Sequence, residues 1–273
     1  MADIESFFAT VRLPSISHVA QALITMLDTE NASIDDVCAL IARDPAIAAR
    51  LLQLANSSQF GLSRSVGLLE DSVALVGLDR VRSLAVGASL SESFNDFPGL
   101  DRDAFWKCAM DSAGYAQWLA LRVGIHGHIA WLTGMMLHMG QLLIAQADQE
   151  VLTQIDRLPR IAGVRWRREQ RLMGFSEGQI TAEMARRWNF PPQMVQALRR
   201  ASDPMAEDGF SRLSAIVHLA GLLAETPHPG AHSIADLPPD VLTALQLDPQ
   251  WMRNTFPDRE KFVNVSSLVN TSR

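Results

Sequence analysis

The spacing of apolar residues constrains this chain more than any other feature of its sequence. Apolar side chains recur at three- and four-residue steps from end to end, a spacing that places them on one face of a helix. One clear example consists of Ile34, Val37, Leu40 and Ile41. Two-residue alternation bounded by turns is nowhere convincing, and we find no sustained heptads or tandem repeats. The sequence therefore predicts an all-α, multi-helix fold without a substantial sheet.

Capping residues predict where several of these helices begin. Ser33 opens a sequence with the spacing of a capping box, in which a hydroxyl accepts a hydrogen bond from a free backbone amide. Asp44 and Pro45 are expected to end that helix and begin the next, because proline suits the first helical position. Asp248 and Pro249 are expected to begin the last helix in the same way. Further helices are predicted over residues 68–76, 79–91, 103–123, 129–147, 164–173, 177–188, 192–200 and 211–224.

Turn-forming residues divide the chain. The polar, glycine-containing stretch 56–67 is predicted to be a structured loop. Residues 93–101 contain proline and glycine and are the best candidate for a subdomain boundary. We therefore predict an N-terminal helical part over residues 1–97, a helical core over residues 98–226, and a C-terminal loop with short helices over residues 227–273.

Composition is that of an ordinary globular protein. Of 273 residues, 48% are hydrophobic and 20% are charged, which excludes a disordered class. No apolar run approaches the roughly 20 residues of a membrane span, and the N-terminus carries acids where a signal peptide carries basic residues. The two cysteines, Cys38 and Cys108, lie far apart, so no disulfide framework is expected. We therefore expect a cytoplasmic protein with no membrane partner.

Arginine is concentrated between residues 160 and 200. This stretch has nine arginines and three glutamates, a net charge of +6, whereas the whole chain carries −6. The asymmetry predicts an anionic ligand or an acidic partner, although solvated faces of ordinary helices are the simpler explanation. The candidates for an anion site are Arg165, Arg167, Arg168 and Arg171. The acidic net charge and the single tyrosine argue against a nucleic-acid partner.

The motifs of common enzymes are absent from the sequence. It contains no phosphate-binding loop, no dinucleotide-binding glycine motif, no nucleophile elbow and no His-Glu-x-x-His zinc motif. Neither cysteine belongs to a Cys-x-x-Cys pair, which argues against a structural zinc site. Any chemistry would therefore have to come from another kind of site.

Two stretches of the chain resemble a known family. The first, residues 13–90, contains the segments RDP, LLQLANSS and VALVGLDRVRSL, and the second extends over residues 105–223. Together they are similar to the HDOD (HD-related output) domain, a bacterial module related to the metal-dependent phosphohydrolases of the HD superfamily. The resemblance implies that residues 1–97 are the N-terminal part of an HDOD module and residues 98–226 a degenerate HD-like core.

The metal-binding positions of the HD pattern are almost all changed in this chain. Catalytic relatives carry ligands in a Phe-Trp-x-His-Ser run, a His-Asp pair, a loop before a helix, a His-His pair and a late aspartate. The corresponding positions here are Cys108, His138 with Met139, Glu177, Ala201 with Ser202, and Gly221. Only His138 keeps the expected residue. The resemblance therefore implies a degenerate site with no catalytic residue, no metal and no cofactor.

Chemistry leads to the same expectation. Hydrolysis at such a site needs divalent cations held by imidazole and carboxylate groups, and the methionine after His138 cannot replace aspartate for a hard metal. With Met135 and Met136 it suggests a site refilled by apolar side chains, which makes His138 a hydrogen-bonded core histidine. Other histidines offer no replacement. His126 and His128 have the wrong spacing for one helix face, and His128 is expected roughly 15 Å along a helix from His138.

The leading hypothesis is a non-catalytic signal-transduction adaptor that binds other signalling proteins, with a nucleotide second messenger as a further candidate partner. The alternatives are a metal-dependent phosphohydrolase or phosphodiesterase with a rebuilt site, and a nucleotide sensor that uses the vestigial pocket without hydrolysis. Inward-facing arginines favour the alternatives, whereas outward-facing arginines around a filled core favour the adaptor. The loop residues Gln59, Phe60 and Arg64 are candidates for a recognition surface, although a purely structural loop is the simpler interpretation.

Overall fold

Helices and the loops between them make up the described part of the chain. The computed structural model describes residues 4–27, 33–57, 66–94, 99–157, 161–206 and 209–263. Within these ranges it contains helices and no strand, which confirms the predicted all-α fold. No helix within them combines the length and the apolar character that crossing a membrane requires.

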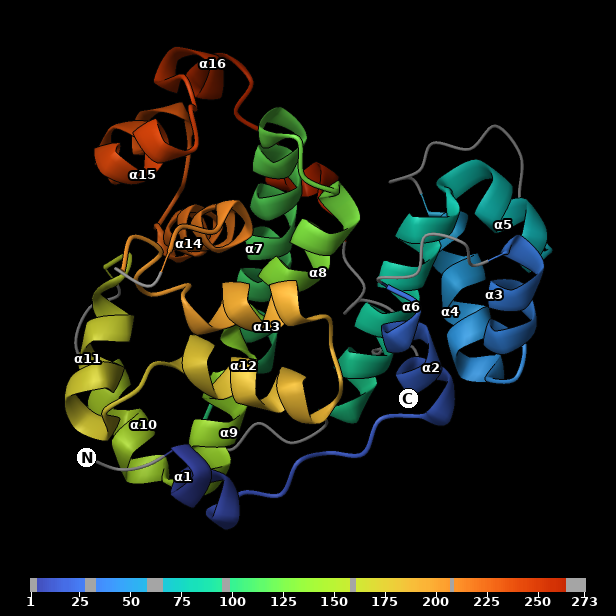
Figure 1. Cartoon of the computed structure of the whole chain (residues 1–273), viewed down its shortest axis with the longest axis horizontal. Coiled ribbons are helices and arrows are strands. Elements are labelled where there is room, and N and C mark those ends of the chain that lie inside the picture. Colours follow the sequence, from blue (N-terminus) through green and yellow to red (C-terminus); the bar gives the residue numbers. More distant parts are fainter. Residues whose placement is uncertain are drawn as a thin grey trace.

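The helices form two lobes, which are seen apart in Figure 1. The N-terminal lobe consists of α2 (His18–Thr25), α3 (Ile34–Ile41), α4 (Pro45–Ala55), α5 (Leu69–Val76) and α6 (Leu78–Ser93). Helix α6 contacts the other four helices of its lobe and also reaches the second lobe, where it packs on α8 (Gly127–Met136). Because α6 contacts both lobes, most of its side chains are buried.

The second lobe is built around the long helix α7 (Arg102–Val123), which packs against α8 and α14 (Arg212–Glu225). Its other helices, in chain order, are η1 (Leu137–Met139), α9 (Gly140–Ala147), α10 (Gln149–Asp156), α11 (Val164–Met173), α12 (Glu177–Arg187), α13 (Pro192–Arg199), η2 (Ala231–Asp236), α15 (Pro239–Ala244), α16 (Pro249–Asn254) and η3 (Arg259–Lys261). The three η elements are short 3₁₀ helices.

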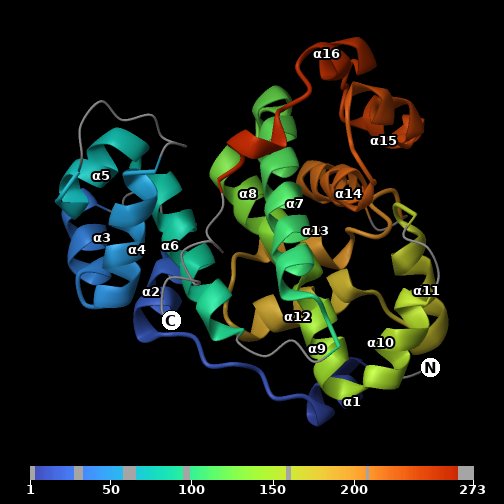
Figure 2. The same cartoon turned by 180° about the vertical axis from the view of Figure 1, so that it is seen from behind.

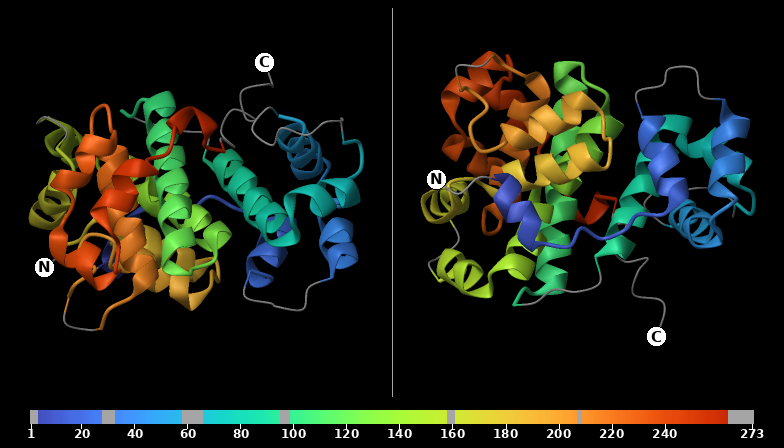
Figure 3. Two further views of the ribbon diagram at one scale, coloured as in Figure 1. Left: turned by 90° about the horizontal axis from the view of Figure 1, so that it is seen from above. Right: turned by 60° about the horizontal axis from the view of Figure 1, so that its bottom comes forward.

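The first helix, α1 (Ile4–Thr10), packs on the second lobe although it begins the chain. The ring centroids of Phe7 and Phe175 lie 5.5 Å apart, and Arg187 donates a hydrogen bond of 2.7 Å to Glu5. Figure 3 shows the chain passing from α1 across to the other lobe. The part predicted over residues 1–97 therefore includes one helix that contacts the core.

Three of the predicted caps lie where the sequence places them. Ser33 Oγ accepts a hydrogen bond from the amide of Asp36 at the start of α3. Asp44 accepts from two amides at the start of α4, where Pro45 is the first residue. Asp248 does the same work for α16, with Pro249 at the first position. Each cap satisfies a backbone donor that has no partner inside its helix.

The single helix predicted over residues 129–147 is wrong, because the chain forms α8, η1 and α9 there instead. The interruption coincides with a close approach to α12. The amide of Gly140 donates a 2.8 Å hydrogen bond to Thr181 Oγ1, and a Cβ atom added to Gly140 would lie 2.2 Å from the carbonyl oxygen of Glu177. Helices α1, α2 and α10 were not predicted, and η2 lies in the stretch that was expected to be only a loop.

The end of the described chain lies across α7. We call residues 256–263 the C-terminal strap; Figure 2 shows its η3 segment beside α7. Phe262 packs directly over Gly114, where an added Cβ atom would lie 2.3 Å from the phenyl ring. Its ring centroid is 5.1 Å from that of Tyr115, and Arg259 forms an ion pair with Asp111 of α7. The strap is therefore a fixed part of the second lobe.

Candidate functional site

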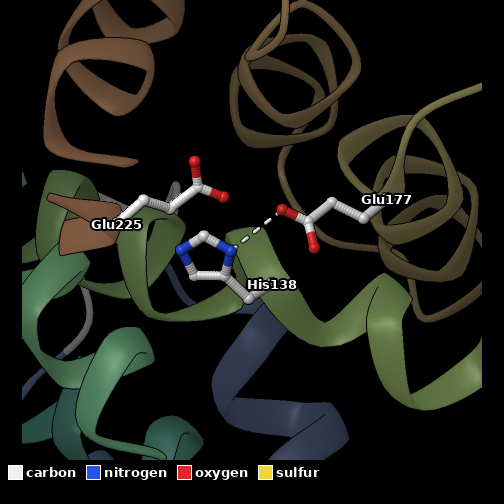
Figure 4. Close-up of side chains that lie close together, drawn as sticks. All are labelled: His138, Glu177 and Glu225. Atoms are coloured by element: carbon white, nitrogen blue, oxygen red, sulfur yellow. Dashed lines mark hydrogen bonds and ion pairs between the residues drawn. The ribbon is translucent and has the colours of Figure 1, made fainter. Parts of the chain in front are cut away.

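His138 occupies the 3₁₀ turn η1, between α8 and α9, and is fully buried. Its Nδ1 lies 2.9 Å from Glu177 Oε1, and its Nε2 lies 2.9 Å from Ser112 Oγ. Figure 4 shows the ring between the carboxylates of Glu177 and Glu225. Both ring nitrogens therefore have hydrogen-bond partners, as expected for a core histidine.

Two side chains of α7 approach the same ring nitrogen. Cys108 and Ser112 are four residues apart, which places them on one face of α7. Cys108 Sγ lies 3.6 Å from His138 Nε2, slightly farther than the hydroxyl of Ser112. The cysteine that replaces a ligand of the HD pattern thus lies directly beside the histidine that remains.

Glu177 is the first residue of α12 and is fully buried. Its backbone amide donates to Glu169 Oε2 at 2.7 Å, and Trp166 Nε1 donates to its Oε1 at 3.0 Å. Position at a helix N-terminus suits a carboxylate, because the helix dipole and free amides favour negative charge there. Glu177 is thus held in place from α11 as well as by His138.

Arg165 of α11 neutralises this group of carboxylates. Its Nε donates to Glu169 Oε1 at 2.8 Å and lies 3.6 Å from Glu177 Oε2, and its guanidinium also pairs with Asp156. The side chain is 11% exposed. Burial alone would lower the pKa of Arg165, but the carboxylates of Glu169 and Glu177 raise it above its ordinary value. Arg165 is therefore a permanent cation of this site.

The ionisation of the central pair follows from these contacts. Burial favours the neutral forms, but the contacts of His138 with Cys108 and Glu177 raise the pKa of its imidazole well above its usual range. The pKa of Glu177 is lowered against the effect of burial, chiefly by His138. In contrast, burial and the nearby Glu177 raise the pKa of both Glu169 and Glu225. The pair therefore consists of an imidazolium and a carboxylate.

A cavity of about 390 Å³ opens beside His138. Residues from α7, α9, α10, α11, the end of α14 and the C-terminal strap line it. Its ionisable lining consists of Asp101, Lys107, Cys108, Asp111, His138, Asp156, Arg165, Arg168, Glu225, His228 and Arg259. Apolar groups such as Phe105 and Ile155 complete the wall. The volume falls within the range of small-molecule pockets in proteins.

The predicted apolar refilling is therefore wrong at His138, where polar groups and a cavity remain. The methionines at 135, 136 and 139 are fully buried, and none of them lines the cavity. Refilling does occur at Gly221, where an added Cβ atom would lie 2.7 Å from Leu137 Cδ2 and 3.0 Å from Trp166. A carboxylate at position 221 would need the space that these two side chains occupy.

The remaining replaced positions do not contact His138. The carbonyl of Ala201 accepts a 2.7 Å hydrogen bond from His218 Nδ1, and Ser202 Oγ lies 3.3 Å from the hydroxyl of Ser176. Both residues therefore serve local packing near the start of α12. The carboxylate that sequence reasoning missed is Glu225, which lies one helical turn beyond Gly221 and hence on the same face of α14.

The four candidate arginines point in two directions. Arg165 and Arg168 line the cavity, whereas Arg167 and Arg171 are exposed. Arg168 Nη1 also donates to the carbonyl of Ile155 at 3.0 Å. The structure thus brings two of the four to one site. The candidate loop residues Gln59, Phe60 and Arg64 lie outside the described residues.

A divalent metal, which the HD resemblance brings into question, does not fit the groups at this site. One nitrogen or oxygen from each of His138, Glu177 and Glu225 lies within 4.8 Å of the others, in an arrangement that could hold a metal. However, the two His138 nitrogens already contact Glu177 and Ser112, and an imidazolium has no lone pair to offer. Arg165 and His138 already balance the charge of Glu177, so a dication would add uncompensated positive charge.

Comparison with known proteins places this architecture among solved structures and one family. The model of the HDOD domain matches residues 13–204. A candidate phosphohydrolase from Shewanella amazonensis SB2B superposes with a TM-score of 0.76 at 21% identity, covering 98% of both chains. A candidate signal transduction protein from Marinobacter aquaeolei VT8 gives 0.76 at 23% identity, covering 98% of this chain and 61% of the other.

An HDOD domain protein from Geobacter sulfurreducens gives a TM-score of 0.68 at 21% identity, with 97% and 91% of the two chains covered. At these identities the likeness shows a shared fold. No curated protein matches the sequence.

Proposed function

This chain belongs to the HDOD domain family, and we propose that within it the chain acts as a non-catalytic signalling module that binds other proteins. The proposal rests on one observation, the closed charge balance around His138. The imidazole is held between Glu177 and Ser112, and Arg165 neutralises the carboxylates behind it. Every group that could activate water or phosphate is thus engaged by another protein group.

Hydrolysis of a phosphoester would need an activated water molecule. A general base must have a free lone pair near neutral pH, and His138 is held as a cation by Glu177. A metal-bound hydroxide would need ligands that Met139 and Gly221 do not offer. The site therefore supports structural rigidity and binding better than turnover.

Exposed apolar side chains on the N-terminal lobe support a protein partner. Leu75 of α5 is 49% exposed and Leu68, just before the same helix, is 62% exposed. Ile34 is exposed at the start of α3, a helix that contacts α5. Exposed apolar groups on neighbouring elements favour an interaction surface. The Marinobacter relative, named for signal transduction, fits this proposal.

Metal content and turnover test the absence of catalysis. The protein is purified without chelators, its metal is quantified, and a generic phosphodiester and several nucleotides are assayed with manganese, zinc or iron. We expect no stoichiometric metal and no turnover. Bound metal with turnover that is lost in His138→Ala, but kept in His126→Ala outside the cavity, would refute the proposal.

Cross-linking in native lysate tests the proposed surface. We expect cross-linked partners to be lost in the double variant Leu68→Asp, Leu75→Asp, because the added charges interrupt an apolar surface. Leu121→Asp provides the matched control, since Leu121 is 74% exposed but lies on α7 in the other lobe. Equal losses in both variants would remove the support for a surface on the N-terminal lobe.

The cavity favours a second candidate function, a sensor that binds a nucleotide without hydrolysing it. Lys107, Arg168 and Arg259 in its wall could contact phosphate oxygens. If so, nucleotides should raise the melting temperature of the wild type and of Arg167→Ala, but not that of Arg168→Ala. No shift with any nucleotide would exclude this candidate.

A further inference from the structure

Cys108, His138 and Glu177 form a row of three groups that we call the thiol relay. Cys108 Sγ lies 3.6 Å from His138 Nε2, and the opposite ring nitrogen lies 2.9 Å from Glu177 Oε1. A thiol, an imidazole and an orienting carboxylate stand in this order wherever proteins activate a cysteine as a nucleophile. The geometry thus provides a route for the thiol proton onto His138.

The thiol of the relay is accessible only through the cavity wall that it forms. Cys108 is half-buried and lines the cavity of about 390 Å³ together with the fully buried His138. The other cysteine differs in every respect. Cys38 is 3% exposed, and burial, with Glu70 and Asp35, raises the pKa of its thiol. The chain therefore contains one accessible cysteine beside an imidazole and one inert cysteine.

Cations surround the position where a thiolate would form. His138 carries a raised pKa, and Lys107 and Arg259 lie in the same cavity wall. The pKa of Arg259 is raised, first by its hydrogen bond with Asp111 and in small part by Cys108 itself, which places the guanidinium near the sulfur. An electropositive, partly exposed surrounding is typical of reactive cysteines.

A second feature of the cavity points to a polar guest. Arg165 lines the cavity, and its Nη2 is buried without a hydrogen-bond partner among the described residues. A buried donor without an acceptor is costly, so a small molecule with an oxygen acceptor would be favoured there.

We propose that Cys108 is a modification site, a nucleophilic thiol assisted by His138 that reacts inside the cavity with small oxidants of the peroxide class. The thiol proton passes to His138 Nε2, and the sulfur attacks one peroxide oxygen. The S–O bond forms as the O–O bond breaks, and the departing hydroxide takes the proton from His138 to leave as water. Sulfur loses two electrons and hydrogen peroxide gains them, so the products are a sulfenic acid and one water.

Sulfenic acid formation would alter the site without a metal or a turnover cycle. The added oxygen lies beside His138 and competes with Ser112 for Nε2, which changes the hydrogen bonds of a fully buried residue. Because sulfenic acids are reversible, the modification would give the protein a chemical input. This reactivity does not depend on the proposed signalling function, and each can fail while the other stands.

Mass spectrometry of the full chain treated with hydrogen peroxide and dimedone tests the proposal. We expect the dimedone adduct of Cys108 to form at least tenfold faster than that of Cys38, and faster than that of glutathione under the same conditions. A Cys108 rate equal to or below that of glutathione would overturn the proposal, whatever the metal and turnover assays give.

Variants separate assistance by His138 from mere exposure. We expect His138→Gln to slow the modification of Cys108 at least fivefold, while His218→Gln, which changes a buried histidine outside the cavity lining, leaves the rate unchanged. The rate of Cys38 reports on folding, because this buried thiol becomes reactive if a variant unfolds. If His138→Gln does not fold, Ser112→Ala replaces it. Removing this competitor for Nε2 should keep or increase the Cys108 rate, and a fivefold loss there would contradict the relay.

Discussion

Arg165 determines the electrostatics of the candidate site more than any other residue. It holds Glu169, Glu177 and Asp156 together in a region where water is excluded, and a buried charge without a partner is strongly destabilising. The imidazolium of His138 supplies the second positive charge. At this scale the site is an alternation of cations and carboxylates that leaves no position for a dication.

Removal of Arg165 should therefore unfold the protein more easily. Arg165→Ala leaves the carboxylates uncompensated, and we expect a loss of about 3–5 kcal/mol in the free energy of unfolding. Arg167→Ala, two residues away and exposed, should change it by less than about 0.5 kcal/mol. Urea denaturation measures both. Similar losses in the two variants would contradict the role given to Arg165.

The two buried histidines of the second lobe should respond to pH in opposite directions. The folded pKa of His138 is raised above the unfolded value of about 6.5, so its stabilising contribution is present below that pH and is lost as pH rises through the folded pKa. Burial lowers the pKa of His218, so its contribution is lost as pH falls below about 6.5.

Imidazole ¹⁵N NMR measures both states directly. At pH 7 we expect His138 to be doubly protonated and His218 to be neutral, with its hydrogen on Nδ1, the atom that donates to the carbonyl of Ala201. A neutral His138 at pH 7 would contradict the imidazolium–carboxylate pair.

Among the elements, η1 and its neighbours depend on glycine for their close approach. Gly140 allows α9 to meet the first turn of α12, and Gly134 of α8 approaches α7 so closely that an added Cβ atom would lie 2.7 Å from the carbonyl oxygen of Ser112. These contacts bring Cys108, His138 and Glu177 together from three helical segments. The relay thus depends on the backbone as much as on its side chains.

A methyl group at Gly140 should separate these elements. The backbone of Gly140 is in an ordinary helical conformation, so Gly140→Ala would act only through the clash with the carbonyl of Glu177. We expect a loss of about 1–3 kcal/mol in thermal or urea unfolding. Gly127→Ala, at the start of α8 with only ordinary contacts to Gln117, should be neutral or stabilise by up to about 1 kcal/mol. The reverse order would show that η1 tolerates a wider spacing.

For the whole molecule, the C-terminal strap links the end of the described chain to the centre of the second lobe. Its phenyl ring packs over Gly114, and its arginine both pairs with Asp111 and forms part of the cavity wall. Just before the strap, Trp251 of α16 stacks on Trp118 of α7, with ring centroids 5.5 Å apart. The last helices therefore complete the cavity that the core begins.

Loss of the Phe262 ring should weaken this closure. Phe262→Ala leaves the surface over Gly114 uncovered, and we expect the free energy of unfolding to fall by about 2–4 kcal/mol, because the ring is partly buried. Phe210→Ala, at a position 43% exposed, should cost less than about 1 kcal/mol. Iodoacetamide should also label Cys108 faster in Phe262→Ala than in Phe210→Ala. Equal labelling would show that the strap does not limit entry to the cavity.

The sequence by itself determined the helices and the family, because both depend on local patterns. Apolar spacing predicted an all-α fold, and short-range hydrogen bonds predicted the caps at Ser33, Asp44 and Asp248. Motifs along the chain also aligned Cys108 and Glu177 with positions that the structure brings to His138.

Only the tertiary structure decided what that alignment means. The break in the helix at η1, the neutralising role of Arg165, the approach of Glu225 and the closure of the cavity by Arg259 all arise between residues far apart in the chain. Spacing along a helix predicts which side chains share a face, but not what packs against that face. Burial and charge compensation result from those long-range contacts, so the same residue pattern could have produced a filled core or, as here, an ionic cluster beside an open cavity.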